Sequence, residues 1–330
     1  MKEESSEEAA LFAIVHALGS RMHPRVFLGI GDDAALWQPS RSHRSAISSD
    51  AFVDGVHFQR GVTSSNRIGA RAINAATSDL AAMGARPLLA TVSLGFPPDC
   101  GIPEISELTD GIALAASRLE LSIVGGDCTR SERLTLSVTV IGEVRSTQAK
   151  RRDGARVGDI VAITGDLGAS FAGLRALADS SLLDGALRSE AIDAYESPVA
   201  RVAEGRWLSA SKHVHAMMDC SDGLGRDSAR MARASNVGIL LERIPVARSL
   251  AAMAQRGGED AEALALAAGE DYELIAAVAP RAFPYLNARF KARFGRELLP
   301  VGYCDAQAGV RWRRNETQTR VEHFGWDHFL

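Results

Sequence analysis

Acidic residues recur beside glycines or next to apolar segments, and this repetition is the strongest chemical signal in the sequence. The apolar segments are typical of strands, so most of these carboxylates are expected where a strand gives way to a loop. Asp79 is different, because it lies on a mostly apolar face of a predicted helix, where an unpaired carboxylate is costly. The acidic segments are residues 29–33, 48–50, 78–80, 125–127, 219–223 and 269–271.

Carboxylates gathered in this way would repel one another unless cations lay between them. Mg²⁺ prefers oxygen ligands and is commonly held by one or two carboxylates together with the phosphates of a substrate. Glycines next to the acids allow the backbone to approach phosphate oxygens and to donate N–H groups to them. The acidic segments therefore predict a site for several Mg²⁺ ions and a polyphosphate such as ATP.

Each acidic segment also has an ordinary structural interpretation. Asp32 and Asp33 belong to a Gly-Asp-Asp sequence that is common in turns, and Asp50 could cap the segment that follows it. Asp222 could be the N-cap of a helix predicted at 222–235. The number of the segments and their repeated position, rather than any one of them, favour the functional interpretation.

The composition excludes several classes of protein. The chain has 330 residues, 46% of them hydrophobic and 24% charged, which predicts a globular protein of about two domains. A net charge of −4 offers no positive field for nucleic acid or anionic lipid, and no apolar run approaches the roughly 20 residues that span a bilayer. The four cysteines form no C-x-x-C pair, so neither a zinc site nor a disulfide framework is expected. The acidic N-terminus does not resemble a signal peptide, and we expect a cytoplasmic protein without nucleic-acid or membrane partners.

Lysine is rare, with four in the whole chain, and none lies in a G-x-x-x-x-G-K-[ST] loop. An ATP site in this protein would therefore hold the phosphates through metal ions rather than through the commonest lysine-based motif.

Apolar periodicity places the acidic segments on strands and helices that alternate along the chain. A polar and basic stretch at 145–158 marks the junction between an N-terminal domain, 1–148, and a C-terminal domain, 149–330. The interleaving favours an α/β class with mixed sheets. Helices are predicted at 66–83, 103–119, 169–178 and 222–235, and strands at 45–52, 88–94, 121–124, 134–144, 159–164, 216–218 and 272–278.

Three further residues could contact a ligand or belong to ordinary structure. His57 follows an acidic strand end, but a surface or core histidine is the simpler interpretation. Arg152 could hold a phosphate, although its place in the basic junction favours a solvated side chain. Trp326 could belong to the core or could stack on an aromatic ligand.

These motifs resemble the thiamine-monophosphate kinase family, within the superfamily that includes aminoimidazole ribonucleotide synthetase. The most specific are Ser-Asp-Leu-Ala-Ala-Met-Gly-Ala at 78–85 and Gly-Glu-Asp-Tyr-Glu-Leu at 269–274. Other matching segments follow the family's order at 28–36, 48–58, 124–130, 219–224 and 325–329. The resemblance implies a two-domain aminoimidazole ribonucleotide synthetase-like fold, a homodimer formed through the N-terminal domains, and a C-terminal domain that completes the nucleotide and substrate cleft.

The resemblance also implies a role for individual residues. The thiamine substrate would be contacted by His57, Glu270 and Trp326. ATP would be contacted by Gly126, Asp127, Arg152 and Ser221. The magnesium ligands would be Asp32, Ser49, Asp50, Asp79, Asp127, Asp219 and Asp222.

The implied reaction is the ATP-dependent phosphorylation of thiamine monophosphate to thiamine diphosphate by direct in-line transfer. The attacking phosphate oxygen is already anionic near neutral pH, so no general base is expected. Three alternatives stay open at this point. They are a ligase-type enzyme that activates a carbonyl or amide oxygen with ATP, a nucleotide-binding regulatory or scaffold protein, and a structural protein with solvated acidic turns.

Overall fold

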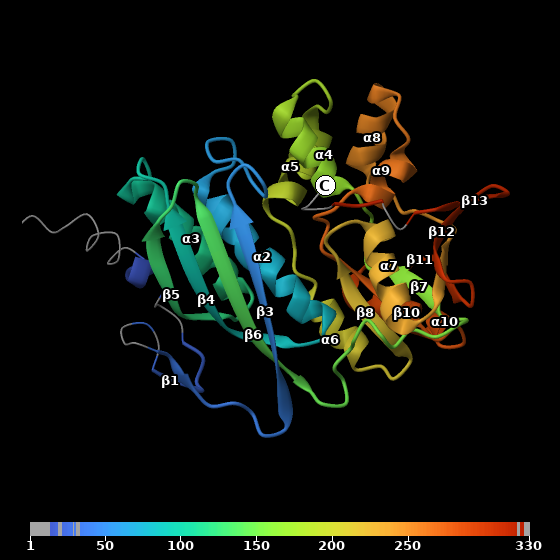
Figure 1. The fold of residues 1–330 in the computed structure, drawn as a ribbon, viewed down its shortest axis with the longest axis horizontal. Coiled ribbons are helices and arrows are strands. Elements are labelled where there is room, and N and C mark those ends of the chain that lie inside the picture. The colour runs from blue at the N-terminus through green and yellow to red at the C-terminus, as the bar shows by residue number, and fades with distance from the viewer. Residues whose placement is uncertain (1–13, 19–21, 29, 31–33, 322–323, 327–330) are drawn as a thin grey trace, which may run out of the picture. The chain divides into compact units, whose positions relative to one another are not determined.

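The computed structural model describes residues 14–18, 22–28, 30, 34–321 and 324–326. They divide into two compact units (Figure 1). One unit comprises Met1–Leu80 and Ala85–Ser146, and the other comprises Ala81–Gly84 and Thr147–Leu330. The predicted magnesium ligand Asp32 lies outside the described residues.

The first unit is built on a four-stranded sheet in the order β3-β6-β4-β5, in which β4 and β5 are parallel and the other pairs antiparallel. A separate antiparallel pair joins β1 to β2. The predicted helices and strands of this half are confirmed, with longer strands than expected. The elements are β1 (Val26–Leu28), β2 (Leu36–Trp37), β3 (His43–Val53), α2 (Ser65–Ala82), β4 (Arg86–Phe96), α3 (Ile102–Arg118), β5 (Ser122–Arg130) and β6 (Thr135–Arg145).

Alternation along β6 gives the four-stranded sheet two different faces. Leu136, Val138 and Val140 are fully buried, whereas Ser137 and Thr139 between them are half-buried. A Cβ on Gly142 would lie 3.1 Å from a methyl carbon of Leu80, which places α2 over the buried face. The opposite face carries small polar side chains.

The second unit contains a seven-stranded sheet in the order β13-β12-β9-β11-β7-β10-β8, with β12 and β9 parallel and the other pairs antiparallel. The mixed sheets of both units confirm the predicted α/β class. The elements are β7 (Ile160–Ile163), α4 (Ala169–Ala178), α5 (Gly185–Glu196), α6 (Val202–Ser209), β8 (Val214–Cys220), α7 (Leu224–Ser235), β9 (Gly238–Leu241), α8 (Arg248–Gly257), α9 (Ala261–Ala267), β10 (Glu273–Val278), α10 (Phe283–Phe294), β11 (Leu299–Asp305), β12 (Gly309–Arg314) and β13 (Thr317–Arg320).

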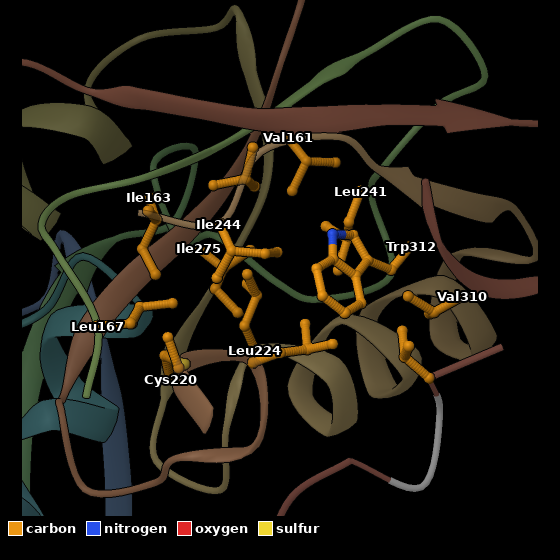
Figure 2. Close-up of a cluster of buried hydrophobic side chains, with 14 of the residues drawn as sticks. Val161, Ile163, Leu167, Cys220, Leu224, Leu241, Ile244, Ile275, Val310 and Trp312 are labelled. Atoms are coloured by element: carbon orange, nitrogen blue, oxygen red, sulfur yellow. The ribbon is translucent and has the colours of Figure 1, made fainter. Parts of the chain in front are cut away.

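The main core of the second unit packs α7, α4 and α8 against one face of this sheet. Figure 2 shows Cys220 and Leu224 within this apolar cluster, and both side chains are fully buried. These two residues bracket the acidic segment 221–223, so the core anchors it at each end. The four cysteines are free thiols, as predicted.

None of the helices in the described part of the chain is long and apolar enough to cross a membrane.

Candidate active site

In the first unit, the structure brings Asp79 of α2 next to β3. The hydroxyl of Ser48 donates a hydrogen bond to Asp79 Oδ2. This contact explains how a carboxylate is tolerated on a largely apolar helix. Ser48 and Asp50 are two residues apart on β3 and so share the sheet face toward α2, and Asp50 and Asp79 are both half-buried. The expectation that Asp50 ends a strand is wrong, because β3 continues to Val53.

Ser49 points to the opposite face of the same strand. Its hydroxyl lies 2.9 Å from Thr139 Oγ1 on β6, and the two residues are paired in the sheet register. The predicted ligands Ser49 and Asp50 therefore present their side chains to different faces.

Asp127 lies on β5, at the other edge of the sheet from β3. The prediction that the strand stops at residue 124 is wrong, because β5 runs through both glycines to Arg130. Three inter-strand spacings of about 4.8 Å separate the backbones of β3 and β5 by about 14 Å. The predicted ligands Asp50 and Asp127 thus lie on opposite edge strands of one sheet.

The packing of strand β5 against β4 requires glycine at position 126. A Cβ at this position would lie 1.9 Å from the carbonyl oxygen of Val92 on the parallel strand β4. At Gly125, the neighbouring position, a Cβ would meet only a methyl group of Thr91 at 3.8 Å. The close approach of β4 therefore requires glycine at 126 and not at 125.

His57 lies in the turn after β3. The backbone N–H of Val53 donates to His57 Nδ1 at 3.1 Å, and the ring packs edge-on against Phe52 with centroids 5.8 Å apart. A neutral His57 therefore carries its proton on Nε2, so Nε2 is the ring nitrogen that can donate a hydrogen bond to a ligand.

In the second unit, three segments that the sequence singled out meet around the end of β8. Asp219 is the second-last residue of this edge strand and is 6% exposed. The N–H of Glu270 donates to the carbonyl oxygen of Ser221 at 2.7 Å. The N–H of Trp326 donates to the carbonyl oxygen of Asp222 at 2.9 Å. Four predicted contacts of this unit are thus joined in pairs through their backbones: Glu270 with Ser221, and Trp326 with Asp222.

The backbone is strained where Glu270 joins this group. Glu270 and Tyr272 have φ values of 68° and 52°, which side chains other than glycine seldom adopt. Between them, the half-buried Asp271 accepts hydrogen bonds from Gly168 N at 2.7 Å and Ser170 N at 3.4 Å, at the start of α4. Burial raises the pKa of Asp271 to about 7. Asp271 therefore fixes the strained segment to the start of α4.

Asp222 does not cap α7, so that interpretation is wrong. The N-cap position belongs to Gly223, and Asp222 Oδ2 instead lies 2.5 Å from Nη2 of Arg230. Asp227, in the first turn of α7, accepts hydrogen bonds from Ser221 N at 3.0 Å and Asp222 N at 2.9 Å. Burial raises the pKa of Asp227 to about 6.

Trp326 and Arg152 are both exposed to solvent. Trp326 is 52% exposed, so its indole is a surface for stacking rather than part of the core. Arg152 lies exposed on a turn, and its own backbone carbonyl oxygen accepts a hydrogen bond from Ser235 Oγ at 2.8 Å. The hydrogen bonds that join Glu270 and Trp326 to the acidic segment do not involve Arg152.

The donor chemistry of the predicted ligands fits Mg²⁺, because every one offers a carboxylate or hydroxyl oxygen. Among the residues that the structure describes, no three His, Cys, Asp or Glu side chains lie close enough together to hold a metal ion. Such residues fit sites with one or two carboxylates each, which the phosphates of a nucleotide and water would complete.

Sequence reasoning missed Asp227, Arg230 and Asp271 as supporting residues. Asp271 was in a noted motif, but its partners at the start of α4 are distant in sequence. Asp227 had a local signal, since an acid in the first turn of a helix is well placed to bind the N–H groups just before it.

Comparison with known proteins matches both units to one family. Residues 31–144 match the profile described as AIR synthase related protein, N-terminal domain. Residues 156–292 match the profile described as AIR synthase related protein, C-terminal domain.

Individual relatives carry a more specific name. A thiamine-monophosphate kinase of Synechococcus elongatus is 36% identical over 244 residues, which cover 70% of this chain and 75% of the relative. The crystal structure of the thiamine-monophosphate kinase of Stenotrophomonas maltophilia superposes with a TM-score of 0.82 at 32% identity, covering 96% of this chain and 98% of the other. A structure of AaThiL complexed with AMPPCP and TMP has a TM-score of 0.77 at 29% identity, with coverage of 97% and 96%.

Proposed function

The chain belongs to the thiamine-monophosphate kinase family of AIR synthase related proteins, and on that premise we propose that it transfers the γ-phosphoryl group of ATP to thiamine monophosphate. The products are thiamine diphosphate and ADP. The observation that carries the proposal is the meeting of Ser221, Asp222, Glu270 and Trp326 through backbone hydrogen bonds. The complex of a related protein with AMPPCP and TMP supports the same pair of substrates.

The reaction needs little proton chemistry from the protein. The phosphate of thiamine monophosphate is already largely deprotonated near pH 7 and can attack the γ-phosphorus directly. We therefore assign no general base and no catalytic nucleophile. What the site must do is hold two polyanions in line against their repulsion.

Seven residues are proposed to hold Mg²⁺, which would neutralise charge on the phosphates of both substrates. Among the described ligands of this set, Asp219 is buried, and Asp50, Asp79 and Asp222 are half-buried. The full set is Asp32, Ser49, Asp50, Asp79, Asp127, Asp219 and Asp222.

The proposed contacts with the nucleotide use groups that remain accessible in the folded chain. The N–H of Ser221 already donates to Asp227, so its hydroxyl is the group we propose for the contact with ATP. Arg152, exposed on its turn, is proposed to reach a phosphate. Gly126 and Asp127 would contribute from β5 of the N-terminal domain.

The residues proposed to contact thiamine monophosphate suit a substrate that has aromatic rings and a positive charge. The exposed indole of Trp326 offers a stacking surface for the rings of the substrate. The thiazolium ring is positively charged, so the carboxylate of Glu270 is proposed to lie against it. His57 would donate from Nε2, because Nδ1 accepts from Val53 N.

The proposal includes a homodimer formed through the N-terminal domains. Ile47 lies on the polar face of the four-stranded sheet and is 67% exposed. Ala51, on the same face of β3, is also exposed. A sheet face with small residues and an exposed isoleucine is suited to pack against a second copy.

The test is to incubate the purified protein with thiamine monophosphate, ATP and Mg²⁺, oxidise the products to fluorescent thiochromes and separate them. The proposal expects a thiamine diphosphate peak that requires protein, ATP and Mg²⁺. A ligase-type enzyme would give no such peak and would release inorganic phosphate only when its own substrate was added. Folded protein that binds Mg-ATP but forms no thiamine diphosphate would reject the proposed acceptor.

A further inference from the structure

Arg230 on α7 lies between two carboxylates of the acidic segment. Its Nη2 is 2.5 Å from Asp222 Oδ2, and its Nη1 is 2.7 Å from Asp227 Oδ1. The Asp227 side chain is completely buried, whereas those of Asp222 and Arg230 are 20% and 36% exposed. The guanidinium of Arg230 thus links the buried carboxylate of Asp227 to the partly exposed carboxylate of Asp222.

The two carboxylates differ in how firmly they are held. Asp227 Oδ2 accepts two backbone N–H groups, from Ser221 and Asp222, and its Oδ1 accepts from Arg230. Removing Asp227 from this arrangement would leave buried donors without partners, which is costly. Asp222 is more exposed, so its carboxylate is the one that can exchange its partner at low cost.

We propose that Arg230 is a positioning residue that acts as a built-in counter-cation for Asp222 and is displaced from this carboxylate when a divalent cation binds there. The inference rests on the proposed function, which makes Asp222 a magnesium ligand. A guanidinium 2.5 Å from a carboxylate oxygen occupies space and charge that a metal ion would need, and two cations at that distance repel. Arg230 stays anchored on Asp227 through Nη1 while Nη2 moves away.

This arrangement has two consequences for the protein without metal. Arg230 compensates the negative charge of Asp222 and Asp227, and so keeps the segment in place before substrates arrive. It also competes with the metal ion, so the affinity for the ion is lower than the carboxylates alone would give. An arginine at 230 therefore sets the concentration of divalent cation at which the segment becomes loaded.

The test uses Mn²⁺ as the probe, since its free concentration can be followed by electron paramagnetic resonance with the full-length protein and no nucleotide. Removing the competing guanidinium in Arg230→Gln is expected to tighten Mn²⁺ binding about fivefold, the effect of losing a partly exposed ion pair. The matched control is Arg233→Gln, which removes an exposed arginine from the same helix and should leave Mn²⁺ binding unchanged.

A double-mutant cycle shows whether the effect passes through Asp222. In an Asp222→Asn background, the further change Arg230→Gln is expected to have no effect on Mn²⁺ binding. An equal gain in both backgrounds, or in the Arg233→Gln control, would overturn the proposal. If Arg230→Gln does not fold, Arg230→Lys decides, because a single ammonium cannot span both carboxylates and should also tighten binding. Unchanged binding in both Arg230 variants would overturn the proposal.

The two proposals fail in different ways. Wild-type protein that forms thiamine diphosphate, with Mn²⁺ affinity unchanged in the Arg230 variants, would reject only the role of Arg230. Tighter Mn²⁺ binding in those variants, together with wild-type protein that forms no thiamine diphosphate, would support the role of Arg230 and reject the kinase reaction. Wild-type protein that binds no Mn²⁺, either alone or with ADP present, would overturn both the role of Arg230 and the proposed metal ligands.

Discussion

The backbone N–H of Trp326 donates to the carbonyl oxygen of Asp222 at 2.9 Å, which ties the end of the described chain to the acidic segment after β8. Close packing reinforces this contact, because a Cβ on Gly325 would lie 2.4 Å from the same carbonyl oxygen. An aromatic side chain and a proposed metal ligand are thus held at a defined separation by the backbone, independently of any ligand.

Trp326→Ala should weaken the binding of thiamine monophosphate without slowing the phosphoryl transfer step. The backbone contact to Asp222 is kept, and only the stacking surface is lost, so we expect KM for thiamine monophosphate to rise about tenfold with kcat nearly unchanged. Steady-state kinetics measure both constants. The control is Tyr285→Ala, which removes another exposed aromatic residue of the same unit. A large loss of kcat in Trp326→Ala would show that the indole also orients the reacting groups.

Asp219→Asn should lower kcat by roughly 10²–10³-fold, because a proposed magnesium ligand would lose its negative charge. Asparagine has nearly the same size, so the fold of β8 should persist, which circular dichroism and thermal unfolding would check. Asp110→Asn on the exposed side of α3 is the matched control and should retain full activity. Activity near that of the wild type in Asp219→Asn would remove this residue from the proposed ligands.

Gly126→Ala and Gly125→Ala compare a position where the neighbouring strand requires glycine with one where it does not. The first places a methyl group against the carbonyl oxygen of Val92 and should lower the free energy of unfolding by about 3 kcal/mol. The second has room for the methyl group and should cost less than 1 kcal/mol. Urea unfolding of both variants measures the difference. Equal stabilities would contradict the register of β4 and β5.

Asp271 should make the stability of the protein depend on pH. Its pKa is raised by burial to about 7 in the folded chain, from a usual value of 3.8. The folded protein therefore keeps this proton at a pH where the unfolded chain has released it. The stability that results is complete below about pH 4 and is lost as the pH rises through about 7.

Unfolding experiments between pH 5 and 8 on wild-type protein and Asp271→Asn test this pH dependence. Asparagine cannot ionise, so the stability of the wild type relative to the variant should fall as the pH rises across this range. Parallel curves for the two proteins would mean that Asp271 keeps one protonation state throughout.

Local periodicity was enough to predict helices α2 and α3 and the four strands of the main sheet of the first unit. The spacing of apolar residues predicts a helix at 66–83 and a strand at 134–144, and the structure has α2 at Ser65–Ala82 and β6 at Thr135–Arg145. In the second unit, α4 and α7 were predicted, but α5, α6, α8, α9 and α10 were not. Of these, α5 and α10 have 12 residues and α6 has eight, so they depend on long-range packing more than on a strong local pattern.

The candidate site could be predicted as a set of residues but not as an arrangement. The glycines at 125 and 126 have the composition of a turn, yet they continue a strand, because the close approach of β4 cannot be seen from one segment alone. Likewise, the partner of Asp222 is Arg230, and a capping pattern in the sequence pointed to the helix N-terminus instead. Pairings between segments distant in sequence depend on the folded chain.

The most direct test of the central claim follows the γ-phosphoryl group itself. ATP labelled at the γ-phosphate is incubated with the protein, thiamine monophosphate and Mg²⁺, and the label is traced in the separated products. Direct transfer predicts that the label appears in the terminal phosphate of thiamine diphosphate, in equal amount to the ADP formed. Label released as inorganic phosphate, with no labelled thiamine diphosphate, would contradict the proposed reaction.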